Sequence, residues 1–165
     1  MTANQVRTFR CKPFPDVELS ADSGYWSGTL TLGEATLPMS IYISAEVSDA
    51  SLRAASTLLS DLLTLRKRGR AAIADEAESD ATIMRDFFLL HVEEVPECLP
   101  EAVRLTATNE AFVGALELVG VAIHPDDEAS FQVVLDFSFG RDYSDQVLAV
   151  KFHPDGSIWQ VSHES

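Results

Sequence analysis

Alternating apolar and polar positions predict strands near both ends of the chain. Residues 27–32 are rich in β-forming side chains, and after Gly33 and Glu34 the same pattern resumes. In the second run, apolar residues recur at every second position, namely at Leu37, Met39, Ile41 and Ile43. Two such runs joined by a short turn predict a β-hairpin, and Pro38 favours an edge position because it cannot donate a backbone hydrogen bond.

The C-terminal third has the clearest strand pattern. A strand over residues 131–139 would place Phe131, Val133, Leu135, Phe137 and Phe139 on one face, which should be core, and Gln132, Val134, Asp136 and Ser138 on the other. Two further apolar runs, 146–153 and 157–163, flank a His-Pro-Asp-Gly turn in which Gly156 can take positive φ. These three runs predict an antiparallel meander.

Helical spacing occupies the middle of the chain. Ser48 or Asp49 can cap a long helix over about residues 50–75, and Ser79 or Asp80 can cap a second helix that Pro96 stops. A short helix is expected after Thr108, whereas residues 118–123 fit a buried strand and a continued helix equally well.

Strands at both ends and helices between them predict an α+β fold. We expect one antiparallel sheet, made of the N-terminal hairpin and the C-terminal meander, with two or three helices packed on one face. The length of 165 residues fits a single domain, 1–165. Tyr25, Trp26 and Trp159 lie at strand positions and are expected in the core.

The charge narrows the range of partners. The chain carries 26 acidic and 12 basic residues, a formal charge of −14, which repels nucleic acid and anionic membranes and favours a basic protein as partner. Eleven acidic residues face only three basic ones from position 101 onward. The binding residues predicted on this acidic face are Asp126, Asp127, Glu128, Asp142 and Asp145.

Cysteine usage and the lack of an apolar leader predict a cytoplasmic protein. Cys11 and Cys98 are far apart and have no CxxC spacing, which favours reduced thiols over a disulfide framework or a zinc site. The N-terminus lacks the layout of a signal peptide, and no apolar run approaches the roughly 18 residues of a membrane span.

Carboxylates cluster near Gly140, where Asp142 and Asp145 follow Arg141 and Asp136 precedes them. Paired carboxylates can bind a divalent cation or share a proton. The spacing is not that of a calcium loop, however, and acids in a turn more commonly cap backbone amides or face water. We therefore favour a turn over a metal site here.

Four histidines lie in separate predicted elements and show no metal-binding spacing. On a helix, His91 and Glu94 would share a face, but a carboxylate-bridged site needs a second such motif, so a surface helix end is favoured. His153 and His163 would approach each other if the terminal hairpin pairs closely, while His124 has no evident role. Nucleophile and nucleotide-binding motifs are missing, so we predict no catalytic residue, no metal and no cofactor.

A basic run, residues 66–70, holds four of the twelve basic residues. Cations near a helix C-terminus complement the helix dipole, and Gly69 could mark such an end. On this interpretation the long helix stops near Gly69.

The segment from Val134 to Trp159, with its Asp145-Gln-Val-Leu strand start, its Asp155-Gly turn and the terminal Glu164-Ser165, resembles the closing segment of small uncharacterised bacterial domain-of-unknown-function proteins. It covers about a fifth of the chain. Some such families are similar to members of bacterial toxin-immunity neighbourhoods, a resemblance that implies protein binding and supplies no catalytic residues.

Two hypotheses of function follow. The first is a non-catalytic acidic protein-binding module, immunity-type or regulatory. The alternative is a small metal-assisted hydrolase or ligand-binding domain built on Asp136, Asp142, Asp145 and a C-terminal histidine. A homodimer that covers the hairpin edge or the helix pair is compatible with both.

Overall fold

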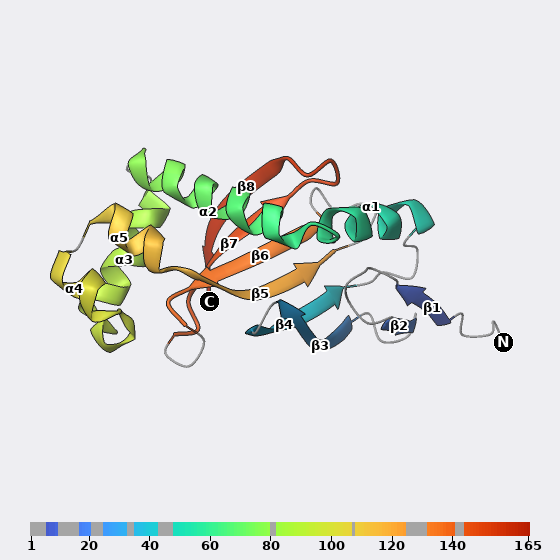
Figure 1. Cartoon of the computed structure of the whole chain (residues 1–165), viewed down its shortest axis with the longest axis horizontal. Coiled ribbons are helices and arrows are strands. Elements are labelled where there is room, and N and C mark those ends of the chain that lie inside the picture. Colours follow the sequence, from blue (N-terminus) through green and yellow to red (C-terminus); the bar gives the residue numbers. More distant parts are fainter. Residues whose placement is uncertain are drawn as a thin grey trace.

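A computed structural model describes the α+β architecture of the chain (Figure 1). It describes residues 6–9, 17–20, 25–32, 35–42, 48–79, 82–106, 108–124, 132–140 and 144–165. The helices between residues 49 and 78 run along one face of a six-stranded sheet, and those between residues 82 and 115 gather at one end of it. A separate two-stranded hairpin is made of β1 (Val6–Phe9) and β2 (Val17–Ser20).

The six-stranded sheet is mixed, although antiparallel pairs dominate it. Its strands are β3 (Tyr25–Leu32), β4 (Ala35–Tyr42), β5 (Glu117–Ile123), β6 (Val133–Ser138), β7 (Val147–Phe152) and β8 (Ile158–Glu164), in this spatial order. The hairpin and the meander are both present, but β4 pairs parallel with β5, so the expectation of a purely antiparallel sheet is wrong at this junction. A parallel pair needs a long crossover, and here the helical middle of the chain provides it.

Pro38 lies on an interior strand, which contradicts its predicted edge position. The edge is β3, and β4 is held between β3 and β5. The parallel pairing involves only Met39 to Ile41 of β4, so Pro38 stands just outside the stretch that pairs with β5. The missing backbone N–H therefore costs no bond in that ladder.

Five α-helices and one short 3-10 turn replace the two or three helices that the sequence predicts. They are α1 (Asp49–Leu59), α2 (Leu62–Glu78), α3 (Thr82–Glu93), η1 (Pro96–Cys98), α4 (Glu101–Thr106) and α5 (Asn109–Ala115). The expected long helix is divided at Asp61, whose carboxylate accepts a hydrogen bond from the Thr64 N–H and starts a new helix. The cap at Ser48 is confirmed, and the short helix expected after Thr108 is present, with the Thr108 hydroxyl accepting a hydrogen bond from the Ala111 N–H.

Gly69 does not end a helix, so that prediction is wrong. It lies in the middle of α2 and is buried against the sheet, where an added Cβ would come within 3.1 Å of the Phe137 ring. The glycine is needed here for close packing of helix on sheet.

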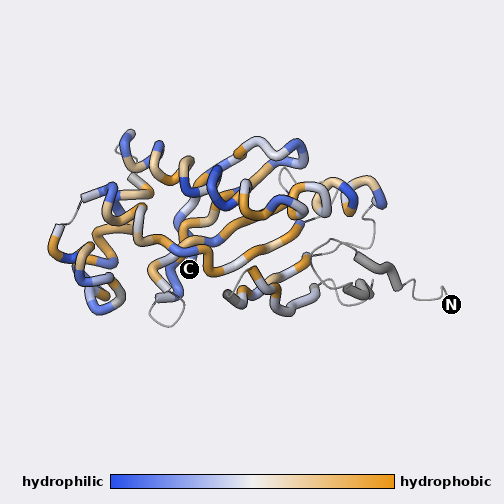
Figure 2. The backbone as a smooth tube through the Cα atoms, viewed as in Figure 1, coloured by the Kyte–Doolittle hydropathy of each residue, from blue (hydrophilic) through white to orange (hydrophobic). Residues whose placement is uncertain are grey.

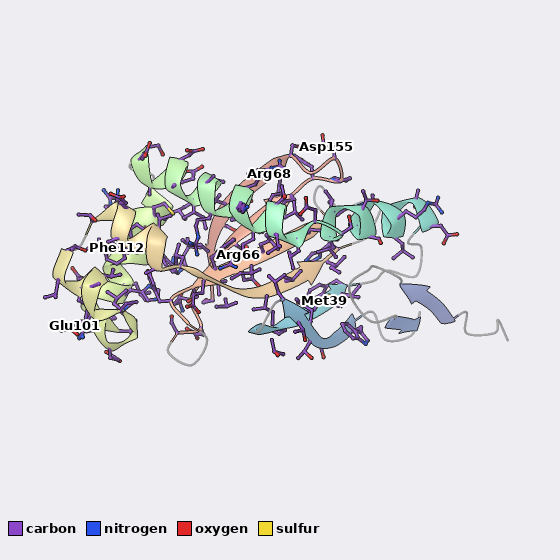
Figure 3. All side chains as sticks on the ribbon, in the orientation of Figure 1. Met39, Arg66, Arg68, Glu101, Phe112 and Asp155 are labelled. Carbon is purple, nitrogen blue, oxygen red and sulfur yellow. The ribbon has the colours of Figure 1, made fainter. Side chains whose placement is uncertain are left out.

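The basic run tethers α2 to its neighbours and is not placed at a helix end. The Arg68 guanidinium donates a hydrogen bond to the Gly156 carbonyl in the β7–β8 turn. Figure 3 labels Arg68 and, in the same turn, Asp155. The Arg70 guanidinium donates to the Leu116 carbonyl just before β5. These cations satisfy carbonyl groups inside the molecule.

Both faces of the central strands are buried. Val133, Leu135 and Phe137 lie in the core as predicted. On the opposite face Val134 and Ser138 are buried too, and only Asp136 is half-exposed among the residues of β6. Figure 2 shows the resulting run of apolar residues along the central strands.

The terminal hairpin is confirmed, with Gly156 at φ 82° in its turn and its N–H bonded to the His153 carbonyl. A register shift separates Lys151 from Phe152, whose partners are Gln160 and Ile158, so Trp159 is the extra residue of a bulge. Trp159 is therefore 42% exposed, and its predicted place in the core is wrong. Trp26 packs partly buried against the core, while the side chain of Tyr25 lies outside the described part.

Candidate functional site

The outer face of the sheet, opposite the helices, carries one polar group of side chains. Core residues Ile41, Ile123, Val150 and Phe152 point toward the helices, so their neighbours Tyr42, His124 and Lys151 project from the outer face. Glu164 pairs with Val147 at the start of β7 and shares that face.

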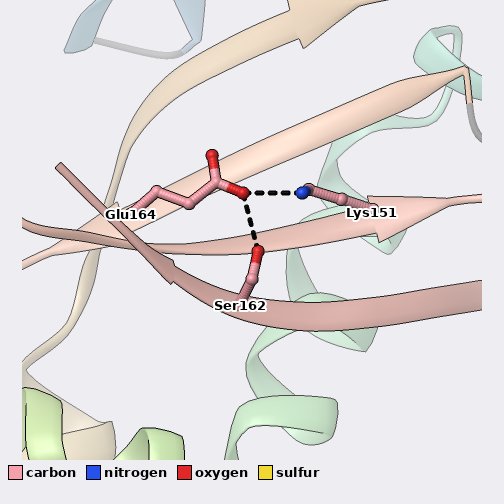
Figure 4. A network of polar contacts seen from close by, with 3 residues as sticks. All are labelled: Lys151, Ser162 and Glu164. Carbon is pink, nitrogen blue, oxygen red and sulfur yellow. Dashed lines mark hydrogen bonds and ion pairs between the residues drawn. The ribbon is translucent and has the colours of Figure 1, made fainter.

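Lys151 and Glu164 form the centre of this outer group (Figure 4). Lys151 Nζ lies 2.6 Å from Glu164 Oε1, and the same carboxylate oxygen accepts a 2.7 Å hydrogen bond from Ser162 Oγ. The two charged residues stand four residue pairs apart on neighbouring strands, and the pair of small side chains between them on this face, Ala149 and Ser162, leaves room for the contact. Lys151 Nζ also lies 5.8 Å from the centre of the Trp159 ring.

His124 stacks on Tyr42 beside this pair, with ring centroids 4.6 Å apart and planes 6° from parallel. Burial lowers the pKa of His124, and the nearby Lys151 lowers it further against the opposing effect of Glu164. Burial alone would raise the pKa of Glu164, but hydrogen bonds from Lys151 and Ser162 bring it below its usual value. Near neutral pH the group therefore holds a neutral imidazole and a charge pair whose members satisfy each other.

A second polar cluster is buried between α3 and the start of β7. His91 Nδ1 lies 2.8 Å from the Phe87 carbonyl oxygen, and because a carbonyl can only accept, this nitrogen carries the proton. His91 Nε2 then accepts from the Ser144 hydroxyl at 3.1 Å. Nearby, His163 Nε2 lies 2.8 Å from Gln146 Oε1.

The burial of His91 contradicts the prediction of a surface helix end. The ring is fully buried against Phe87 and Phe139, whereas Glu94 is exposed. Burial lowers the pKa of His91, and the proximity of His163 lowers it further. The hydrogen bond to the Phe87 carbonyl acts in the opposite direction and raises this pKa. The sequence spacing could not predict the burial of His91, because this burial depends on the elements against which α3 packs.

The His91–Ser144 contact has the composition of a base and a hydroxyl nucleophile, but its surroundings indicate an anchor. Ser144 Oγ also accepts from the Gln146 N–H at 3.1 Å in a local turn, and Ser138 Oγ donates to the Gln146 carbonyl. The hydroxyl is thus held in a network that fixes residues 144–146 against α3.

The predicted binding residues are only partly described. Asp126, Asp127, Glu128 and Asp142, like Arg141 and Cys11, lie outside the described residues, as does the side chain of Cys98. Asp145 is exposed, and its carboxylate accepts from the Gln146 side-chain amide at 2.9 Å.

The residues of the metal alternative do not converge where they are described. Asp136 projects from the outer face, whereas His163 faces α3, where its ring packs edge-on against Phe87. His153 stands in the turn and His163 pairs with Leu148 at the other end of the hairpin, so their predicted approach is wrong. Within the described ranges, no three His, Cys, Asp or Glu side chains are grouped so that they could hold a metal ion.

A surface that the sequence interpretation missed runs from α3 into α4. Glu93, Glu94, Glu97 and Glu101 are all exposed, and Figure 3 shows Glu101 at the end of the molecule away from the β7–β8 turn. Leu89 and Val92, on the outward side of α3, are each 44% exposed. The signal was present in the sequence, because no lysine or arginine occurs between Arg85 and Arg104.

Comparison with known proteins gives no relative: no family model matches the chain, and neither curated proteins nor solved structures yield a match. The resemblance of residues 134–165 to small bacterial proteins stays a prediction. Among the helices of the described part, none combines the length and the apolar character that a bilayer crossing needs.

Proposed function

We propose that this protein is a non-catalytic binding module, immunity-type or regulatory, whose acidic surface holds a positively charged protein in the cytoplasm. The observation that carries the proposal is the excess of exposed carboxylates over exposed lysine and arginine side chains in the described part of the chain. Of the sixteen carboxylates whose side chains are described, all except Glu76 and Asp136 are exposed.

Among the described basic side chains, Arg53, Lys67, Arg68, Arg85 and Arg104 are exposed, and some of the basic residues are held by contacts within the molecule. Arg68 and Arg70 donate to backbone carbonyls, and Lys151 is paired with Glu164. The cations that would offset the acidic surface are therefore partly committed to the fold. A partner that approaches from solvent meets mainly carboxylates, and such a field accelerates the approach of a basic surface.

The polar clusters support binding more than catalysis. The outer pair of Lys151 and Glu164 is internally neutralised, and the hydroxyl of Ser144 is held in a turn network. Neither arrangement leaves an activated nucleophile with a defined role.

The test is a pull-down from native lysate with the tagged protein as bait. We expect one basic protein to be retained at low ionic strength and released by salt, because exposed charge pairs are screened over about 10 Å at 0.1 M salt. Retention that salt does not affect, or no basic protein retained at low salt, would overturn the proposal.

Two charge-neutralised baits sharpen the result. In the first, Asp126, Asp127, Glu128, Asp142 and Asp145 are replaced by Asn or Gln. In the second, five acids that are exposed elsewhere are replaced in the same way, namely Asp75, Glu78, Asp86, Glu110 and Glu117. If the C-terminal acids guide the partner, the first bait associates more slowly than the second. Equal association rates would remove these five residues from the contact.

A further inference from the structure

We propose that the outward side of α3 and the segment leading into α4 form the docking surface for the partner, and that the partner contributes a basic amphipathic helix. This surface, called the α3 ridge below, consists of Leu89, Val92, Glu93, Glu94, Glu97 and Glu101. The inference rests on the proposed function and locates the contact that the function requires.

The ridge exists because α3 has apolar residues on two sides. Its inward side is buried through Met84, Phe87, Phe88 and His91. Leu89 and Val92, three positions apart, are neighbours on the outward side, where a solvated helix would normally place polar residues. Two adjacent aliphatic side chains, each 44% exposed, give a partner apolar area to bury.

Acidic groups continue this apolar pair along the chain. Glu93 and Glu94 complete the helix and its last turn, Glu97 lies in η1, and Glu101 begins α4. All four are exposed, and the nearest lysine or arginine residues along the chain are Arg85, one turn before Leu89, and Arg104, both exposed. Burial of His91 beneath them, with both ring nitrogens bonded, fixes the end of the helix that presents them.

Charge decides which occupant fits. In a symmetric contact between two copies, the same patch meets itself, so the four glutamates of both protomers would be brought into one interface and their net charge would oppose the contact. An anionic lipid surface meets the same repulsion. A helix with aliphatic side chains on one stripe and lysine or arginine beside them complements both features of the ridge, in the manner of helix-in-groove recognition.

The two parts of the ridge should affect binding differently. Exposed carboxylates mainly change the rate of association and its dependence on salt. Burial of Leu89 and Val92 should instead set the rate of dissociation, which usually governs affinity among variants of one interface.

The test uses a synthetic basic amphipathic peptide of about 18 residues, long enough to form a helix, with leucines on one stripe flanked by lysines. A second peptide carries glutamate in place of each lysine. Binding to the full chain is followed by fluorescence anisotropy at low and at high salt, and the captured basic protein is titrated in parallel.

Three variants are compared with the unmodified chain. E93Q/E94Q/E97Q/E101Q removes the charges of the ridge, L89S/V92S removes its apolar part, and D75N/E78Q/E110Q/E117Q removes the same charge elsewhere. All substituted side chains are exposed, and circular dichroism with thermal unfolding verifies that each variant is folded.

We expect the basic peptide, and not the acidic one, to bind the unmodified chain and the control variant. Because each exposed ion pair contributes little, the loss of four should weaken binding about tenfold. L89S/V92S should weaken it by faster dissociation.

Equal affinity of the ridge variants and the control would overturn the docking surface. If the captured basic protein still bound these variants in a salt-dependent way, the proposed function would stand, and only its location on the α3 ridge would be wrong. The docking surface would also be overturned if the basic peptide did not bind. A concentration-dependent dimer that L89S/V92S abolishes in sedimentation experiments would overturn it too, because the occupant of the ridge would then be a second copy of the chain.

Discussion

Replacing Gly69 by alanine tests the packing of α2 on the sheet. An alanine Cβ at this position would lie 3.1 Å from Phe137 Cε2 and 3.2 Å from Phe137 Cζ, with Phe152 Cζ at 3.8 Å. Favourable carbon–carbon contacts are about 3.5–4.0 Å long, so the methyl group overlaps the Phe137 ring by several tenths of an ångström. Phe137 and Phe152 are both fully buried, which leaves the ring little room to move away.

Two effects of opposite sign compete in this variant. Alanine gains about 0.8–1 kcal/mol over glycine in a helix interior. Overpacking a filled core costs about 1–3 kcal/mol. Because the ring is enclosed, we expect the cost to exceed the gain and the Gly69→Ala variant to lose about 1 kcal/mol of unfolding free energy.

Gly114 provides the matched control. It lies in α5, it is exposed, and an added Cβ there would have no neighbour within 4 Å. Gly114→Ala should therefore gain stability by up to about 1 kcal/mol, since only the helix propensity changes. Urea unfolding followed by circular dichroism compares the two, and equal stabilisation by both substitutions would refute the idea that Gly69 is required for close packing.

Three further predictions concern pH, a helix cap and the outer charge pair. Burial lowers the pKa of His91 and His124, so the unfolded chain binds protons more readily than the folded one below about pH 6.5. The free energy of unfolding should therefore fall as the pH drops through that value. In urea titrations at several pH values, His91→Phe should make this dependence on pH less steep. Thr108→Ala removes the acceptor of the Ala111 N–H and should cost about 1 kcal/mol in urea unfolding, whereas no loss would mean that water replaces the cap. Glu164→Gln should cost less than about 1 kcal/mol, because the carboxylate is partly exposed, and a cost equal at low and high salt would contradict an electrostatic origin.

Elements defined by neighbouring residues could be predicted from the sequence. The alternation around Leu37 and Met39 indicated the β3–β4 hairpin, and the Pro154–Gly156 turn indicated the β7–β8 hairpin. The short helix expected after Thr108 is present, and the hydroxyl of this residue satisfies one of its first amides. In each case the decisive interaction spans only a few positions.

Features that depend on distant partners could not be predicted. A glycine permits both a helix end and a close approach, and only the ring of Phe137 shows which applies at Gly69. His91 looked like a surface residue because its partner Ser144 lies far along the chain. Alternation placed Val134 on the face opposite the predicted core and could not show that this face is buried there as well.

For the candidate site, composition indicated an acidic surface but not its location. Attention to the C-terminal acids left out Glu93 to Glu101, whose exposure depends on how α3 packs. The apolar partners Leu89 and Val92 fit a helical repeat and were indistinguishable from core positions until the inward side of α3 was known.

The parallel pairing of β4 with β5 has a consequence for how the chain acquires its structure. Met39 pairs with Val121, a residue that is synthesised only after all the helices. Contacts between such distant positions require a large loop to close and are characteristic of slow folding. The β6–β7–β8 meander needs only short turns, so we expect it to form early and the β3–β4 hairpin to join last. Until then, the inner edge of β4 would be open to pairing with other chains, which makes this strand the point where newly made protein is most exposed to aggregation.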